Sequence, residues 1–142
     1  MVKWLDSDTR SDIAKAVREL EKRSSAELRV HVTSRITKPV MDLAVDWFWK
    51  NGMHLTARRN GVLIFVASES HEFAIVGDVG IHAKVGESFW NQTRDTMQNF
   101  FKKGEFKEGV LAGIAAATGV LALYFPVEKG DRNELSDEVS RD

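Results

Sequence analysis

The feature that most constrains the fold is a pair of apolar segments joined by a short polar turn. The first segment, Gly61 to Ala67, is continuously apolar, which is the pattern of a strand covered on both faces. The second, Glu72 to Gly77, is rich in β-branched and aromatic residues. A connection as short as residues 68–71 forces the two strands to run antiparallel. The sequence therefore predicts a β-hairpin from about Asn60 to Asp78.

Two helices and a third strand are predicted before the hairpin. Residues 7–23 repeat apolar side chains at helical spacing behind a Ser7 or Asp8 cap. Residues 28–33 alternate apolar and polar side chains, as in a strand with one better-buried face. A second helix is expected over residues 39–52. Because this helix separates the first strand from the hairpin, a right-handed crossover should make the flanking strands parallel and the sheet mixed.

Two further helices are predicted after the hairpin. One passes through an aromatic-rich segment and stops at Gly104, and the other runs from about Phe106 to Phe125. The order of elements predicts one α/β domain over residues 1–127. Residues 128–142 are predicted to form an acidic C-terminal tail.

The last helix leaves two interpretations open. Val110 to Val127 carries no charge over 18 residues, which is the lower limit of a membrane span, and the pattern Gly109-x-x-x-Gly113 lies at its start. The other interpretation is an Ala-rich helix packed closely on the sheet. No basic cluster lies beside Val127 and the tail is acidic, so we favour the buried helix over contact with a membrane.

Composition and charge narrow the function classes. The chain of 142 residues has 20 basic and 21 acidic side chains and a formal net charge of −1, so nothing favours nucleic acid as a partner. It has no cysteine, which excludes disulfides, thiolate zinc sites and cysteine nucleophiles. The N-terminal residues turn polar without an apolar segment, so no secretory signal is expected and the expected localisation is cytoplasmic.

Several short segments match a known family in the order in which they occur. They are Ser25–Val30, Arg59–Ile64, Phe73–Gly80, Lys103–Gly109 and Asn133–Glu138. With these segments the chain resembles the TPM domain family, which includes thylakoid lumen, photosystem II repair and acetylcholine-receptor-associated proteins and is sometimes labelled TPM phosphatase. It is most similar to the short, stand-alone bacterial branch.

The resemblance carries expectations about fold and function. It implies a three-layer α/β/α sandwich with a small twisted mixed sheet that contains a central β-hairpin. It also implies binding of a divalent cation, Ca²⁺ or Mg²⁺, as in some members, and the acid phosphatase activity reported for a plant member. This sequence lacks the targeting segment of that plant branch and its longer Gly-Leu-Glu signature after the hairpin. The branch that it matches best is mostly described without an assigned reaction.

The predicted strand directions bring three polar residues to one edge of the sheet. Glu27 and Asn60 precede the two parallel strands, and the antiparallel return brings Asp78 to the same edge. Gly77 and Gly80 permit a tight turn there. Oxygen ligands on loops, completed by water and by acids of the tail, are what Mg²⁺ or Ca²⁺ prefer. The sequence therefore predicts a metal site at Glu27, Asn60 and Asp78.

A structural role explains the same three residues. Asp78 can cap the turn or helix that follows it. Glu27 can pair with Arg58 or Arg59 on the surface, an interaction of little energetic weight. Asn60-Gly61 is a common turn dipeptide. The sequence leaves the structural role and the metal site open.

The sequence contains no self-sufficient catalytic motif. The motif HExxH, the Gly-x-Ser-x-Gly elbow and the P-loop do not occur, and His31 is expected to be a packing residue. No catalytic residue is assigned. Three functions remain open: a cation-binding module without an established reaction, a metal-dependent acid phosphatase, and an interaction domain that contacts a membrane or an unknown protein partner through helix 106–125.

Overall fold

The computed structural model describes residues 2–127 and 139–142, and its centre is a four-stranded mixed sheet. The strands are β1 (Glu27–Thr33), β2 (Gly61–Ala67), β3 (Glu72–Gly77) and β4 (Ser140–Arg141), in the spatial order β3-β2-β1-β4. β1 is parallel to β2 and to β4, whereas β2 and β3 are antiparallel. The predicted hairpin and the predicted mixed sheet are confirmed, with β2 in the interior of the sheet and β3 at its edge.

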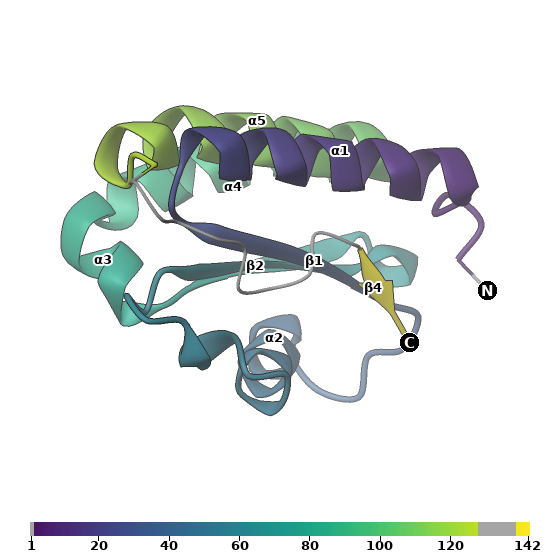
Figure 1. The fold of residues 1–142 in the computed structure, drawn as a ribbon. Coiled ribbons are helices and arrows are strands. Elements are labelled where there is room, and N and C mark those ends of the chain that lie inside the picture. The colour runs from purple at the N-terminus through teal and green to yellow at the C-terminus, as the bar shows by residue number, and fades with distance from the viewer. Residues whose placement is uncertain (1, 128–138) are drawn as a thin grey trace.

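Five α-helices cover the two faces of the sheet among the described residues. They are α1 (Ser7–Arg23), α2 (Val40–Lys50), α3 (Val79–Val85), α4 (Glu87–Lys102) and α5 (Phe106–Tyr124). Figure 1 shows α1, α4 and α5 above the sheet and α2 below it. Two 3₁₀ turns, η1 (Met53–Leu55) and η2 (Ser68–Ser70), lie in the connections. The arrangement is the expected three-layer α/β/α sandwich.

Alternation along the strands divides the core into two parts. Successive side chains of a strand point to opposite faces of the sheet. Leu28, Val30 and Val32 of β1 face the three-helix layer, together with Val62 and Ile64 of β2. The smaller core on the α2 side is built from Ala44, Phe48, Met53, Leu63, Phe65 and Ala74. Because both faces are covered, β2 is buried along its whole length.

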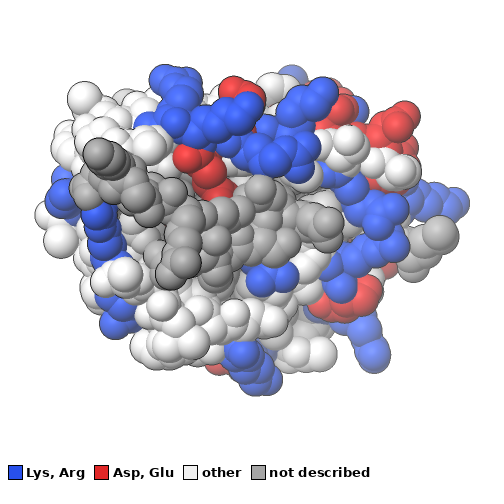
Figure 2. All heavy atoms as spheres, in the orientation of Figure 1, with Lys and Arg blue, Asp and Glu red and all other residues white. Residues whose placement is uncertain are grey.

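The outer face of α1 is charged, as expected for an amphipathic helix. Its inner face buries Ile13, Val17 and Leu20. Figure 2 shows Lys and Arg side chains gathered over this helix, with Asp and Glu among them. The helix is capped by Asp6, whose carboxylate accepts a hydrogen bond from the Thr9 amide at 2.8 Å. The predicted cap at Ser7 or Asp8 is therefore wrong by one or two positions.

Close approach of two helices explains the glycine pattern at the start of α5. A Cβ atom on Gly109 would lie 2.6 Å from the ring of Phe101, and one on Gly113 would lie 2.5 Å from the sulfur of Met97. Both glycines therefore serve the packing of α5 against α4. In the described part of the chain, α5 is the one helix long and apolar enough to span a membrane, and 39% of that apolar window is buried.

The buried face of α5 contains the residues that a helix packed on the sheet should bury. Val110, Ile114 and Leu121 are inaccessible to solvent or nearly so. Leu123, near the C-terminal end of the helix, is 74% exposed. Contact of this exposed end with a membrane or a partner remains a prediction.

Residues 139–142 extend the sheet, which the sequence did not predict. Ser140 and Arg141 form β4 and lie opposite His31 and Val32 of β1. Val139 packs against the larger core. Residues 128–138 of the predicted tail lie outside the described residues.

Candidate functional site

The backbones of Glu27, Asn60 and Asp78 meet where β1 and β2 begin and β3 ends, as the strand directions predict. We call this end of the strands the edge of the candidate site. The amide of Glu27 donates to the carbonyl of Asn60 at 3.1 Å, and the amide of Asp78 donates to the carbonyl of Gly61 at 2.9 Å. All three residues are buried, with exposed fractions of 3% for Glu27, 3% for Asn60 and 5% for Asp78. Polar residues this deeply buried require specific partners.

Alternation along the strands places Glu27 and Asp78 on the α2 side of the sheet. Glu27 has the same parity on β1 as His31, which stacks on Trp47 of α2 with 4.5 Å between ring centroids. Asp78 follows β3 directly with an extended backbone, and it continues the parity of Ala74, which belongs to the core under α2. Two carboxylates therefore lie on one face, at the ends of the two strands that flank β2.

Gly61 lies between these two carboxylates on the same face. It is opposite Glu27 in the β1–β2 pairing, and its carbonyl accepts the Asp78 amide. A Cβ atom at this position would lie 2.9 Å from the main-chain oxygen of Met53. The absence of a side chain thus brings a third oxygen toward the space between Glu27 and Asp78.

The side chain of Asn60 makes a different connection. Its Nδ2 donates to the carbonyl of Ser25 at 2.9 Å, and its amide donates to Oγ1 of Thr56 at 3.1 Å. Asn60 therefore ties the loop before β2 to the turn before β1. The structure brings its backbone to the predicted site and directs its amide group toward Ser25.

Asp78 forms the tightest polar contact at this edge. Its carboxylate accepts from Nε of Arg59 at 2.7 Å and from NH2 of Arg59 at 2.8 Å, and the amide of Val79 donates to the same group at 2.8 Å. The last bond caps α3, the helix that the sequence missed. The cap proposed as the structural role of Asp78 is therefore present.

Arg59 has a partner that the sequence does not predict. The sequence offers Arg58 or Arg59 as a surface partner of Glu27, whereas the structure pairs Arg59 with Asp78. Its hydrogen bonds to the Asp78 carboxylate raise the pKa of the guanidinium above its ordinary value. The side chain is 39% exposed, and its Cζ lies 5.7 Å from the ring centroid of Trp49. In this ion pair the Asp78 carboxylate is buried, whereas the Arg59 side chain is partly exposed to solvent.

The oxygen atoms at this edge are of the kind that hard cations prefer, but the guanidinium of Arg59 already supplies a positive charge there. A carboxylate offers about four lone-pair positions, and three hydrogen bonds to Asp78 are present. Among residues 2–127 and 139–142, no group of three or more His, Asp or Glu side chains is arranged to hold a metal. A cation here would bind two carboxylates in competition with Arg59.

A second polar cluster, which sequence reasoning missed, ties β4 to β1. His31 is 4% exposed, its Nδ1 lies 2.9 Å from Oγ of Ser140, and its Nε2 lies 2.6 Å from Oδ1 of Asp142. Thr33 also donates to the Asp142 carboxylate. Burial lowers the pKa of His31 below its ordinary value, against the opposing effect of Asp142. A neutral ring meets both partners when Nε2–H donates to Asp142 and Nδ1 accepts from Ser140.

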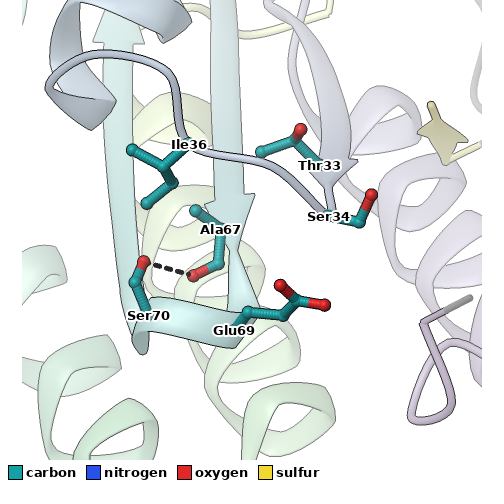
Figure 3. Close-up of a pocket in the computed structure, with 6 residues that line it drawn as sticks. All are labelled: Thr33, Ser34, Ile36, Ala67, Glu69 and Ser70. Carbon is teal, nitrogen blue, oxygen red and sulfur yellow. Dashed lines mark hydrogen bonds between the residues drawn. The ribbon is translucent and has the colours of Figure 1, made fainter.

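A small cavity lies at the opposite end of the strands. Its volume is about 170 Å³, and it is lined by Thr33, Ser34, Ile36, Ala67, Glu69 and Ser70. Figure 3 shows Ser70 bonded back to the carbonyl of Ala67, at 3.1 Å, while Thr33 and Ser34 come from the end of β1. The carboxyl ends of parallel strands are a common ligand position in α/β proteins. Glu69 is the one carboxylate in this lining, so the cavity offers a poorer donor set than the edge at Glu27 and Asp78.

Comparison with known proteins gives a match to one protein family and to several solved structures. The sequence pattern of the TPM domain matches residues 2–120. The BA42 protein from the psychrophilic bacterium Bizionia argentinensis, solved by NMR, is 41% identical, with 96% of this chain and 94% of that chain covered and a TM-score of 0.91.

Two more distant NMR structures share the fold. The N-terminal domain of a protein from P. gingivalis is 20% identical, with 87% of this chain and 82% of that chain covered and a TM-score of 0.71. The N-terminal domain of the cg2496 protein from Corynebacterium glutamicum is 13% identical, with coverage of 82% and 73% and a TM-score of 0.65. No curated protein matches the chain.

Proposed function

We propose that this chain, which belongs to the TPM domain family, is a divalent-cation-binding module in which Glu27 and Asp78 hold the ion. The observation that carries the proposal is the pair of buried carboxylates on one face of the sheet, with Gly61 between them. Ca²⁺ and Mg²⁺ bind such oxygens together with water and main-chain carbonyls. The Met53 oxygen near Gly61 fits that donor type.

Arg59 determines how such a site would work. In the absence of an ion, its guanidinium neutralises the Asp78 carboxylate. A divalent cation bound to Asp78 would repel the guanidinium, and the exposed side chain is free to move into solvent. Binding would therefore be an exchange of cations at Asp78, which predicts weak affinity and strong dependence on Arg59.

Asn60 has a positioning role in this proposal. Its bonds to Ser25 and Thr56 and its carbonyl bond to Glu27 fix the loop that separates the two carboxylates. Asn60→Ala is expected to weaken cation binding less than loss of either carboxylate does. It is also expected to lower stability, because the Ser25 carbonyl loses its hydrogen-bond donor.

The proposal is tested by titrating the protein with CaCl₂ or MgCl₂ and following amide chemical shifts. We expect shifts centred on residues 27, 61 and 78. Asp78→Asn, which keeps the volume and the ability to accept a hydrogen bond, should weaken binding at least tenfold. Arg59→Gln, which removes the competing charge, should strengthen it several-fold. These two opposite effects distinguish a site from a general loss of folding.

Asp8→Asn is the matched control, because Asp8 is an exposed acid in the first turn of α1. It should leave the titration unchanged. Shifts that are confined to other acidic residues, or an affinity that does not respond to Asp78→Asn, would refute the site.

A metal-assisted phosphomonoesterase is a second candidate, and Arg59 is the observation that favours it. A guanidinium released from Asp78 would bind two phosphate oxygens in a planar geometry, and Glu27 and Asp78 would hold an ion that supplies polarisation of the phosphate and of a water molecule. Hydrolysis of p-nitrophenyl phosphate, assayed with Ca²⁺, Mg²⁺ or Mn²⁺ from acidic to neutral pH, should then be lost with EDTA and in Arg59→Gln. Activity that survives EDTA contradicts this mechanism, and no activity under any condition removes the enzyme.

A further inference from the structure

Helix α2 has an exposed apolar face that the fold does not use. Met41, Val45 and Trp49 recur at intervals of four residues and therefore lie in one row. Leu55 follows the helix, in η1, and is close to the Trp49 end of the row, because the ring of its neighbour His54 lies 4.2 Å from the ring of Trp49. We call these four residues the α2 stripe. Their exposed fractions are 44% for Met41, 38% for Val45, 52% for Trp49 and 73% for Leu55.

The rest of α2 already provides the contacts that the core needs. Ala44 and Phe48 are buried against β2 and β3. Trp47, on the flank opposite the stripe, stacks on His31 of β1. The four residues of the stripe therefore belong to neither of the two cores. A contiguous apolar patch of a few hundred Å² on an otherwise polar surface is typical of a binding surface.

We propose that the α2 stripe is the contact surface for a second copy of this chain, in a two-fold symmetric dimer with antiparallel α2 helices. Val45 is the middle one of the three stripe residues on the helix, so it meets Val45 of the second copy on the symmetry axis. Met41 then meets Trp49 of the second copy, and Trp49 meets its Met41. Methionine sulfur packs favourably on aromatic rings. The row is thus complementary to itself in this orientation, as a two-fold interface requires.

The charges around the stripe favour the same orientation. At the Met41 end Lys38 pairs with Asp46, which leaves the exposed acid Asp42. At the Trp49 end Arg59, near the Trp49 ring, pairs with Asp78, which leaves the exposed base Lys50. Antiparallel pairing places the acidic end of each copy against the basic end of the other, whereas parallel pairing opposes like ends. Charge therefore selects the arrangement that the apolar row also fits.

The size of the stripe sets the expected strength of the dimer. Four partly exposed side chains on each copy form less than the roughly 1,600 Å² buried in a standard interface. We therefore expect a dissociation constant on the order of 10⁻⁴ M. The dimer should be populated at the concentrations of an NMR sample and absent at low micromolar concentration.

Sedimentation equilibrium from 10 µM to 1 mM tests the proposal. The apparent mass should rise toward twice that of the monomer, and Val45→Lys should hold it at the monomer value, because two like charges meet on the axis. Leu123→Lys is the matched control, since it adds the same charge at an exposed leucine on another helix. A mass that stays monomeric to 1 mM, or that Val45→Lys and Leu123→Lys change equally, overturns the proposal.

Cysteine trapping gives an independent result, because the chain has no cysteine of its own. Val45→Cys places two thiols on the symmetry axis within reach of a disulfide, for which the Cβ atoms must approach to about 4 Å. Under mild oxidation it should crosslink at least tenfold faster than Leu123→Cys. Equal rates would show random collision and contradict the arrangement. Neither experiment involves Glu27 or Asp78, so failure of the cation site leaves this outcome unaffected.

Discussion

At the scale of the residue, Asp78 and His31 each hold together segments that are distant in sequence. Asp78 joins the end of β3, the start of α3 and the loop that carries Arg59. Arg59 itself has a φ angle of 52°, a left-handed conformation that is uncommon outside glycine. The two hydrogen bonds to Asp78 help to hold that backbone conformation in place. His31 performs the equivalent role for β4.

Removal of the Asp78 carboxylate should destabilise the domain. Asp78→Ala removes the cap of α3 and the partner of Arg59, so we expect the free energy of unfolding to fall by about 2 kcal/mol. Urea unfolding measures the change. Asp8→Ala, at an exposed first-turn acid, should alter stability by less than about 0.5 kcal/mol. Equal effects of the two substitutions would show that the contacts of Asp78 contribute little.

Protonation of His31 should make stability depend on pH. Because burial lowers the pKa of His31 in the folded state, the unfolded chain binds the proton more tightly, with a pKa of about 6.5. The stabilisation is therefore complete above that value and is lost as pH falls below it. Urea midpoints between pH 7.5 and 5.5 should decline less steeply in His31→Gln than in the wild type. His82→Gln, at an exposed histidine, should retain the wild-type slope, and a wild-type slope in His31→Gln would contradict the prediction.

At the scale of the element, some helices and strands follow from local sequence signals, whereas others depend on tertiary contacts. The boundaries of β2 and β3 follow from an apolar run and a turn that lie close together in sequence, and the prediction matches them. α3 was missed because seven residues are too few for a clear helical period, and its start depends on the Asp78 cap. β4 was missed because two residues become a strand only when His31 holds Ser140 and Asp142.

The candidate site likewise has features that the sequence predicts and features that depend on tertiary contacts. Its convergence at one edge could be predicted because strand direction alone decides which ends meet. The partner of Arg59 could not, because it depends on the path of the loop and on a left-handed φ angle. The direction of the Asn60 side chain depends on Ser25, which lies 35 positions earlier. Side-chain partners across such separations carry no local sequence signal.

Two glycines of α5 should respond to alanine in opposite directions. At Gly109 a Cβ atom would press on the buried Phe101 ring at 2.6 Å, whereas at Gly119 nothing lies within 4 Å. We expect Gly109→Ala to destabilise the domain by about 1–3 kcal/mol, through overpacking. Gly119→Ala should stabilise it by about 0.5–1 kcal/mol, because alanine is the better helix former. Thermal unfolding of both variants measures the contrast, and a stabilising Gly109→Ala would contradict close packing of α4 on α5.

At the scale of the whole molecule, the first two elements of the chain pack directly against the last two elements of the described residues. α1 lies beside α5, and the amide of Ser25 donates to the carbonyl of Phe125 at 2.7 Å. Oγ of Ser24 donates to the same carbonyl at 2.8 Å. β4 then lies against β1, and the amide of Asp142 donates to the carbonyl of Val32 at 3.3 Å. The last residues therefore cover part of the outer edge of β1, which limits edge-to-edge association.

The docking of β4 should depend on the Asp142 carboxylate. Asp142→Ala leaves the buried His31 ring without its partner at Nε2, so we expect a loss of about 1–3 kcal/mol. Hydrogen exchange should show the amide of residue 142 exchanging at the rate of an unstructured chain. Arg141→Ala, at an exposed position of the same strand, should preserve its protection. Unchanged exchange in Asp142→Ala would show that the backbone bond to Val32 suffices.

The position of β1 also has a consequence for the order in which the domain can be built. β1 is the first strand to be synthesised, yet it lies between β2 and β4, and its contacts with Ser140 and Asp142 span more than a hundred residues. Contacts of such long sequence separation form late and slow down folding. On the ribosome, α1 and β1 emerge without the neighbours that cover them, α5 and β4. The edge of β1 should therefore stay uncovered, and accessible to chaperones, until residue 140 has been synthesised.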